Sequence, residues 1–244
     1  MSPVIRLAVW SGPRNISTAL MRSWENRPDS IVVDEPLYAH YLDVTGIDHP
    51  GRDEVIASGR TDWRQVVDEL LGPVPAGVDV FYQKHMAHHL TPDVDSDWVG
   101  GLANVLLIRD PTLVIASYLR SRAQVTAEDL GLRQQSLLYD ELCTAGSTPT
   151  VIDSSDFLRD PEGYLRGLCH LIGVPFTQAM LSWPPGPRPT DGVWGRYWYE
   201  AVWRSTGFLP DESRDVDLPA AGADAAAWCQ PLYERLWEAR WQLG

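Results

Sequence analysis

The residues with the clearest chemical potential lie in segment 10–20 (WSGPRNISTAL), between an apolar run and a helix-like stretch. Backbone amides at the start of a helix have no intrahelical acceptor, and together with the helix dipole they form a site for phosphate or sulfate. Ser17 and Thr18 add hydroxyl donors, and Arg14 adds a permanent positive charge. A helix that Ser or Thr simply caps would show the same pattern, so both interpretations stay open. A Walker A loop would carry a second glycine and a lysine before the hydroxyl residue, and this segment has neither there, which disfavours an ordinary ATP or GTP site.

A second group of residues follows a later apolar run, 104–108. Arg109 comes directly after that run, and Ser117 lies further on in the stretch that Pro111 opens as a predicted helix. In an open α/β sheet, ligands bind at the carboxyl ends of the strands. We therefore expect Arg109 and segment 10–20 at one edge of the sheet, where Arg109 and Ser117 could hold a second, separate phosphate.

The elements that would position these residues alternate along the chain. Short apolar runs rich in β-branched residues predict five strands, at 4–10, 30–34, 78–83, 104–108 and 150–152. Helical stretches are predicted between them, at 17–26, from 111 to about 122, and from 161 to about 172. This alternation predicts the α/β class, with an open parallel sheet of about five strands flanked by helices.

The sequence changes character near residue 184. Segment 183–189 (WPPGPRP) cannot form regular structure, because its prolines lack amide donors, and 209–222 is interpreted as a loop. Segment 225–243 then carries large apolar side chains at helical spacing, namely Trp228, Leu232, Leu236, Trp237 and Trp241. This helix is expected to face the core or to mediate self-association, so a homodimer is possible. With no repeat or linker, we expect a single domain over 1–244, with a C-terminal loop and helix extension from about 184.

Composition excludes several classes of function. The 244 residues include 20 basic and 33 acidic side chains, giving a net charge of −13, which argues against binding nucleic acid or anionic membranes. The three cysteines show no metal-binding spacing and are expected to be reduced. No signal peptide and no apolar run long enough for a membrane span are found, so we expect a cytoplasmic protein with a small-molecule partner.

These motifs resemble those of the sulfotransferases that use 3′-phosphoadenosine 5′-phosphosulfate (PAPS). Segment 13–18 (PRNIST) aligns position for position with the family's Pro-Lys-Ser-Gly-Thr-Thr loop, and Arg109 and Ser117 have the spacing of the family's Arg and Ser. Segments 154–162 and 168–176 are similar to the family's Tyr-Glu-Asp-Leu segment and the helix after it. Segment 192–198 (GVWGRYW) is similar to the glycine-rich loop that closes over the nucleotide.

The resemblance implies a P-loop NTPase-like sulfotransferase architecture and a reaction. A sulfuryl group would pass from PAPS, the co-substrate, to a hydroxyl or amine of a small molecule, and no metal is implied. The 5′-phosphosulfate would be bound by Arg14, Asn15, Ile16, Ser17 and Thr18, with Arg14 stabilising the bridging oxygen. Arg109 and Ser117 would bind the 3′-phosphate, and Gly195 and Arg196 would belong to the closing loop.

Three positions depart from the family pattern. Ile16 stands where the loop has glycine, so a backbone with positive φ would be strained there. Arg14 replaces lysine, which keeps the charge and changes the donor geometry. Ser154 replaces the tyrosine that contacts adenine.

Two regions are candidates for the base that the reaction requires. Glu35 follows the second predicted strand directly, as a glutamate does in several sulfotransferases, although it could instead cap an amide or pair with arginine. The third predicted strand leads to Lys84 and His85, where strand alternation would turn His85 away from the face that Lys84 uses. His88 or His89 could replace it if the chain turns immediately, and Lys84 could contact the transferring group. Nearby, the residues expected to line the acceptor pocket are Tyr38, His40, Tyr41 and segment 49–52 (HPGR).

Two other functions stay open on the sequence. A small-molecule kinase would need magnesium, for which Asp110 is the candidate ligand, but the Walker A lysine is missing. A nucleotide-binding module without turnover is the other alternative, and Ile16 is the feature that favours it.

Overall fold

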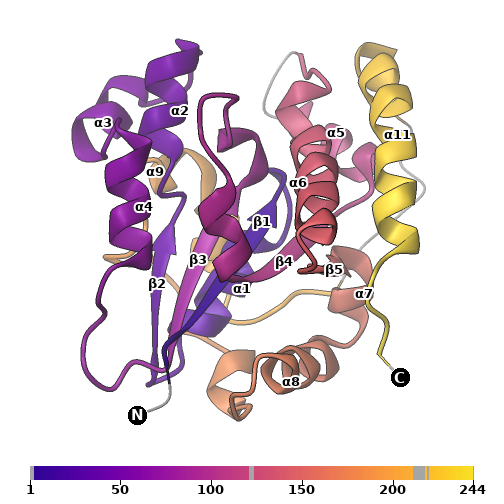
Figure 1. Cartoon of the computed structure of the whole chain (residues 1–244). Coiled ribbons are helices and arrows are strands. Elements are labelled where there is room, and N and C mark those ends of the chain that lie inside the picture. Colours follow the sequence, from indigo (N-terminus) through magenta and orange to yellow (C-terminus); the bar gives the residue numbers. More distant parts are fainter. Residues whose placement is uncertain (1–2, 121–123, 211–217, 219, 244) are drawn as a thin grey trace.

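Five parallel strands form one sheet at the centre of the protein (Figure 1). The structure is a computed structural model that describes residues 3–120, 124–210, 218 and 220–243. The strand order is β2-β3-β1-β4-β5. The strands are β1 (Ile5–Ser11), β2 (Ser30–Asp34), β3 (Val80–Met86), β4 (Ala103–Ile108) and β5 (Thr150–Asp153). The predicted α/β fold with an open parallel sheet flanked by helices is therefore confirmed.

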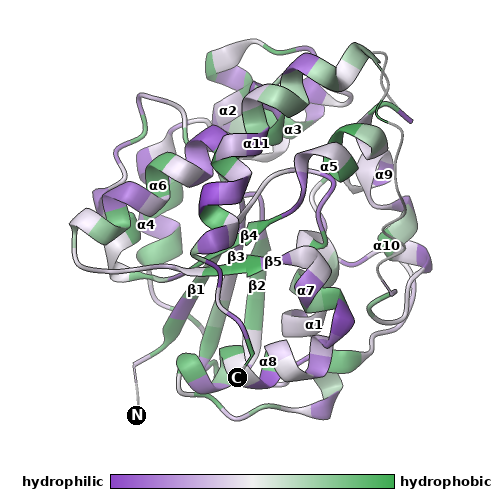
Figure 2. Ribbon diagram, turned by 90° about the vertical axis from the view of Figure 1, so that its right-hand side faces the viewer, coloured by the Kyte–Doolittle hydropathy of each residue, from purple (hydrophilic) through white to green (hydrophobic). Residues whose placement is uncertain are grey.

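Helices cover both faces of this sheet (Figure 2). Alternate residues of β1 divide between the two layers: Ala8 and Trp10 pack toward α5, α6 and α11, whereas Leu7 and Val9 pack toward α1 and α8. The helices are α1 (Ser17–Glu25), α2 (Tyr38–Thr45), α3 (Arg52–Ser58), α4 (Trp63–Leu71), α5 (Pro111–Tyr118), α6 (Leu132–Thr144), α7 (Ser154–Arg159), α8 (Pro161–Leu171), α9 (Gly195–Trp198), α10 (Glu200–Arg204) and α11 (Ala223–Glu238). Strands buried on both faces explain why their sequences read as continuous apolar runs.

Some elements and boundaries differ from the prediction. β3 continues three residues beyond Gln83, because its whole length is buried between β1 and β2. The segment between β2 and β3, for which no element was predicted, forms α2, α3 and α4, and helix α6 was missed as well. α4 is amphipathic and buries Val66, Val67 and Leu70 on one face, so its pattern was present in the sequence and was overlooked. α5 ends at Tyr118, and the end predicted for it, near residue 122, lies outside the described residues.

The predicted apolar stripe of the C-terminal helix divides among different environments. Leu236 is buried, whereas Trp228 and Trp237 are 46% and 39% exposed. The helix, α11, ends at Glu238 rather than near residue 243, and the backbone amide of Trp241 then donates to the Val151 carbonyl at 2.8 Å. Of the predicted loop at 209–222, residues 211–217 and 219 lie outside the described residues. Throughout the described chain, no helix combines the length and apolar character that crossing a membrane requires.

Candidate functional site

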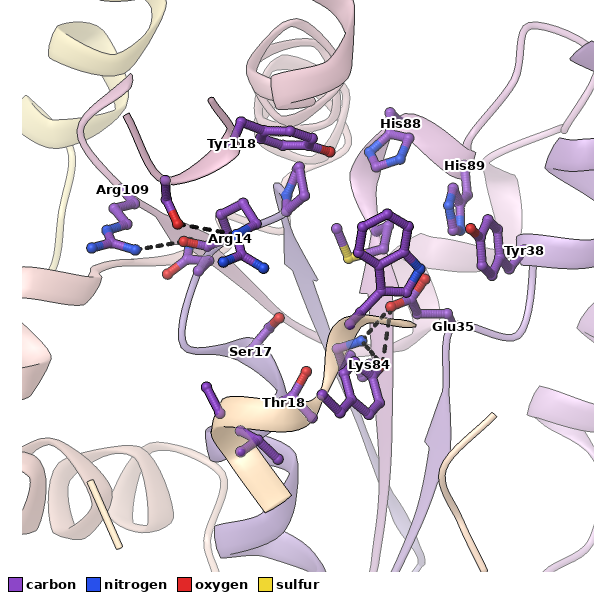
Figure 3. Close-up of a pocket in the computed structure, with 18 of the residues that line it drawn as sticks. Arg14, Ser17, Thr18, Glu35, Tyr38, Lys84, His88, His89, Arg109 and Tyr118 are labelled. Atoms are coloured by element: carbon purple, nitrogen blue, oxygen red, sulfur yellow. Dashed lines mark hydrogen bonds and ion pairs between the residues drawn. The ribbon is translucent and has the colours of Figure 1, made fainter. Parts of the chain in front are cut away.

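A cavity of about 250 Å³ lies at the carboxyl edge of the sheet, where segments from distant parts of the chain meet (Figure 3). The loop after β1 forms one side, and the residues after β2 and β3 form the other. Its lining consists of Pro13, Arg14, Asn15, Ser17, Thr18, Glu35, Tyr38, His49, Lys84, Met86, His88, His89, Arg109, Ser117, Tyr118, Trp198, Tyr199, Ala201 and Val202. The expected meeting of segment 10–20 with Arg109 and Ser117 at one edge is therefore observed.

The loop after β1 presents an uncapped helix start to this cavity. Helix α1 has Ile16 as its N-cap residue and no side-chain cap hydrogen bond, so capping by Ser or Thr is not what the structure shows. The first-turn amides of α1 have no acceptor within the helix and are suited to an anion. Asn15 fixes the loop to β4, because its Nδ2 donates to the Leu107 carbonyl at 3.0 Å and its Oδ1 accepts the Ile16 amide at 2.8 Å.

The strained position of this loop is Arg14 rather than Ile16. Arg14 has φ 56°, whereas Ile16 has φ −83°, a value that any residue adopts. The expectation of strain at Ile16 was wrong because the loop turns two residues earlier. The Ile16 side chain does not line the cavity and packs instead with the apolar cluster between α1 and the sheet. Any contribution of Ile16 to ligand binding would thus come from its backbone.

Basic side chains gather at the α5 end of the cavity. Arg14 Nε donates to Ser117 Oγ at 3.0 Å, and Arg120 Nη2 donates to the same oxygen at 3.1 Å. Arg109 Nη1 donates to the backbone carbonyl of Arg14 at 2.5 Å. Burial lowers the pKa of Arg14 from its ordinary value, and the neighbouring charge of Arg120 acts in the same direction. Arg14 and Arg109 line this end of the cavity and make it positive, and Arg120 adds charge from outside the lining.

On the opposite side, the ammonium group of Lys84 is paired with the carboxylates of Asp34 and Glu35, of which Figure 3 shows Glu35. Lys84 Nζ donates to Asp34 Oδ1 at 2.7 Å, to Glu35 Oε1 at 2.6 Å and to Tyr199 Oη at 2.9 Å. Tyr199 Oη in turn donates to Asp34 Oδ2 at 2.7 Å. Glu35 has φ 43°, a left-handed backbone that is uncommon outside glycine and is often found at functional sites.

Burial sets the protonation behaviour of this group. Burial raises the pKa of Glu35 above its ordinary value, and Asp34 adds to this while Lys84 opposes it. Burial alone would lower the pKa of Lys84, but the Asp34 and Glu35 carboxylates raise it instead. A carboxylate with a raised pKa beside a permanent ammonium ion is suited to accept a proton from a ligand.

The structure corrects His85 as a candidate base. Its side chain does not line the cavity; the ring stacks on Trp10, with centroids 4.0 Å apart, on the other face of the sheet. Because β3 continues past Lys84, the two side chains alternate in direction, as the strand pattern indicated. His88 and His89 do line the cavity, and burial lowers the pKa of His88 to about 4. Over the described ranges, His, Cys, Asp and Glu form no group of three that could hold a metal ion.

Of the residues expected at the acceptor pocket, Tyr38 and His49 line the cavity. The ring of Tyr38 stacks on His89 with centroids 4.7 Å apart, and its hydroxyl lies 2.9 Å from His49 Nδ1. His40 does not reach the cavity, because its ring nitrogens face the Thr61 carbonyl and the Thr91 hydroxyl. Tyr41 stacks on His89 and is likewise absent from the lining.

Gly195 and Arg196 also fall outside the cavity. Arg196 pairs with Glu54 on the surface, and Gly195 starts the short helix α9. From this part of the chain the cavity instead receives Trp198, the last residue of the segment expected to close over the nucleotide. It also receives Tyr199, Ala201 and Val202, which sequence reasoning missed. The density of aromatic residues in 194–203 (WGRYWYEAVW) was the available signal, but it does not distinguish a wall from a core.

Comparisons with known proteins agree with this architecture. The family model described as "Sulfotransferase domain" matches residues 5–237. Branched-chain-amino-acid aminotransferase-like proteins 2 and 1 of Arabidopsis thaliana are 35% and 38% identical over 93% of this chain. The chain spans 40% of the length of each, and those names describe the longer proteins.

Among solved structures, the sulfotransferase domain from the curacin biosynthetic pathway has a similar fold. It aligns with a TM-score of 0.51 and 15% identity, covering 94% of this chain and 98% of that domain. The family match extends over almost the whole sequence, including both sides of the cavity. The chain therefore belongs to the sulfotransferase domain family.

Proposed function

We propose that this protein transfers a sulfuryl group from PAPS to a hydroxyl or amine of a small molecule. The observation that carries the proposal is that two separate groups of donors suited to anions share one cavity with a buried carboxylate. The uncapped start of α1 and the Arg109–Ser117 region both line that cavity, and so does Glu35. A nucleotide with one phosphate at each end suits two such sites.

The reaction follows from the side chains around the cavity. The acceptor oxygen or nitrogen attacks the sulfur atom, and the bond between sulfur and the 5′-phosphate oxygen breaks. Glu35 takes the proton of the acceptor, and 3′-phosphoadenosine 5′-phosphate (PAP) leaves with the electron pair. Positioning and electrostatic stabilisation supply most of the catalysis in the analogous phosphoryl transfers.

Lys84 serves this reaction as the fixed positive charge beside the base. Its ammonium group is 1% exposed and bonds to Glu35 at 2.6 Å, so it is held in place without a substrate. Charge that develops on the transferring sulfuryl oxygens near Glu35 would be stabilised by this ammonium. Ser17 and Thr18 contribute hydroxyl donors at the start of α1, and their side chains line the same cavity.

The two alternative functions receive less support. Asp110, the candidate magnesium ligand of a kinase, caps α5, because its Oδ1 accepts the Thr112 amide at 2.8 Å. Binding without turnover was favoured by Ile16, whose backbone is unstrained at φ −83°. Neither feature now argues against sulfuryl transfer.

The proposal is tested by ligand stabilisation followed by transfer. Thermal unfolding is measured with PAP, with ATP and magnesium, and without ligand. PAP at 100 times its dissociation constant should stabilise the protein by about 2.7 kcal/mol. Label from [35S]PAPS is then followed into panels of alcohols, phenols, amines and sugars. Stabilisation by ATP with magnesium alone would contradict the proposal, and so would the absence of both PAP binding and transfer.

A further inference from the structure

The hydroxyl oxygen of Tyr199 lies among four polar atoms. Lys84 Nζ and Trp194 Nε1 lie 2.9 and 3.1 Å from Tyr199 Oη, and both nitrogens can only donate hydrogen bonds. Two carboxylate oxygens, Asp34 Oδ2 and Glu35 Oε1, lie 2.7 and 3.2 Å away, and both can only accept when ionised. Because the two nitrogens occupy the lone pairs of the hydroxyl oxygen, its single proton remains for one of the two carboxylates.

The distances assign that proton to Asp34. A hydrogen bond from a hydroxyl to a carboxylate is about 2.5–2.7 Å long, a range that Asp34 matches and Glu35 does not. Burial raises the pKa of Tyr199 well above its ordinary value, and both carboxylates add to this effect, so the phenol keeps its proton. Among these groups, Glu35 Oε1 therefore receives a hydrogen bond from Lys84 alone.

The two carboxylates also differ in their access to the cavity at the start of α1. Glu35 lines that cavity, and Asp34 is not among the residues that line it. An acceptor bound there can therefore reach Glu35 and not Asp34. The Asp34 side chain is 1% exposed and receives hydrogen bonds from both Lys84 and Tyr199, at 2.7 Å each, without any substrate. Asp34 thus has the contacts of a fixed counterion.

Tyr199 joins this group of charges to the wall of the cavity. It lies between α9 and α10, and its neighbours Trp198 and Val202 line the cavity together with it. Its hydroxyl bonds to Asp34 at the end of β2 and to Lys84 in β3. The position of the cavity wall is therefore tied to the position of the Lys84 ammonium group.

We propose that Tyr199 is a positioning residue that distinguishes the two carboxylates. It donates its proton to Asp34, which stays the counterion of Lys84, and it leaves Glu35 to act as the base. This inference rests on the proposed function, because a base is needed only if an acceptor must lose a proton. Without the hydroxyl, Asp34 draws Lys84 toward itself, and the ammonium group offsets the burial of Glu35 less.

The protonation of Glu35 reports this arrangement. Burial raises the pKa of Glu35, and Asp34 adds to this, while Lys84 and the Tyr199 hydroxyl act in the opposite direction. Loss of the hydroxyl removes one of these two opposing influences and weakens the other, so the pKa of Glu35 should rise further. Burial lowers the pKa values of His88 and His89, so both are neutral near pH 7. The titratable groups at this end of the cavity are Asp34 on β2, Tyr38 on α2, His49 before α3, Lys84 on β3, His88 and His89 after β3, and Tyr199.

The test removes the hydroxyl and keeps the ring. In Tyr199→Phe, the acidic limb of the kcat/KM profile should move to higher pH by about 0.4–1 unit, the equivalent of one neutral hydrogen bond. Titration of the Glu35 carboxyl carbon by nuclear magnetic resonance should show the same shift. At pH values well above this limb, kcat should fall about tenfold because Lys84 is no longer held in place, while the dissociation constant of PAP stays within a factor of about three. Tyr197→Phe is the matched control, since it makes the same change two residues earlier in an exposed tyrosine whose hydroxyl bonds to Arg196.

An unmoved limb and titration in a folded Tyr199→Phe protein, with transfer intact in the wild type, would overturn this inference alone. If that variant does not fold, Trp194→Phe removes one donor to the same oxygen and keeps Tyr199. The indole lowers the pKa of Tyr199, so its loss makes the phenol a weaker donor to Asp34, and the limb should again move to higher pH, by a smaller amount. A limb that stays or moves to lower pH would contradict the inference. A wild-type protein that neither binds PAP nor transfers a sulfuryl group would overturn the proposed function and this inference with it.

Discussion

Glu35 and Lys84 meet across the ends of two neighbouring parallel strands, with Glu35 Oε1 2.6 Å from Lys84 Nζ. Asp34 is in register with Lys84 on the adjacent strand and bonds to the same ammonium group at 2.7 Å. Two carboxylates therefore share one cation. The positive charge of Lys84 is divided between Asp34 and Glu35, so it only partly offsets the effect of burial on Glu35. The pKa of Glu35 therefore stays raised although Glu35 contacts a cation. This arrangement suits a proton acceptor better than a simple ion pair would.

Replacing Glu35 with glutamine should stop proton removal without disturbing the nucleotide site. Gln has the shape of Glu and cannot act as the base, so turnover should fall about a hundredfold or more. The dissociation constant of PAP should stay within a factor of about three, because Glu35 is expected to face the sulfuryl position, which PAP leaves empty. Rates and PAP affinity are measured side by side, with Glu162→Gln on the surface of α8 as control. Undiminished turnover would assign the base to His88 or His89.

The pH profile of kcat/KM should identify the base independently. A carboxylate accepts a proton only when it is deprotonated, so activity rises with pH through the pKa of Glu35. Ordinary glutamates titrate near pH ~4.3. Because burial raises the pKa of Glu35, the acidic limb of the profile should lie above that value. A histidine base would give a different limb, since burial lowers the pKa of His88 to about 4. A limb at about pH 4 would contradict the assignment to Glu35.

Asp34→Asn should move this limb to lower pH. Removal of the neighbouring negative charge eliminates one cause of the raised pKa of Glu35 and leaves Lys84 to act on Glu35 alone. The pH profile of the variant is compared with that of Asp68→Asn, which changes an exposed carboxylate on α4. Direct titration of the Glu35 carboxyl carbon by nuclear magnetic resonance gives the same information without an acceptor. An unmoved titration in a folded Asp34→Asn protein would show that Asp34 does not influence the base.

Gly12 should not tolerate a side chain. A Cβ atom at this position would overlap the Leu130 carbonyl oxygen, and a backbone atom cannot rotate away as the end of a side chain can. Gly12→Ala should lower the free energy of unfolding by about 1–3 kcal/mol and weaken PAP binding, because the loop before α1 must shift. Gly100→Ala is the matched control, since a Cβ there meets no described atom within 4 Å. Equal stability of the two variants in chemical denaturation would refute this close packing.

The sequence was informative wherever one local pattern carried the signal. Buried parallel strands are continuous apolar runs, so the sheet was predictable, and a hydroxyl-rich turn before a helix marked the loop at Arg14. The expected edge for Arg109 followed from the rule that parallel strands present their carboxyl ends together. These inferences need no knowledge of side-chain direction.

Contacts made at long range were not predictable in this way. Tyr199 reaches Asp34 from a part of the chain 165 residues away, and no local pattern distinguishes it from the tryptophans around it. Arg14 bonds to Ser117 because a left-handed backbone turns it toward α5, and that conformation is unexpected for arginine. Arg196 pairs with a surface glutamate although its neighbour sequence resembles a nucleotide-closing loop. Such positions depend on tertiary packing, which the sequence does not display.

The structure of the protein bound to PAP tests the account most directly. We expect one nucleotide in the cavity, with its 5′-phosphate at the amides that open α1 and its 3′-phosphate within hydrogen-bond distance of Ser117 Oγ. The position next to the 5′-phosphate that the sulfuryl group of PAPS would occupy should then face Glu35 and Lys84. A nucleotide bound elsewhere, or bound here with its two phosphates exchanged, would contradict the account.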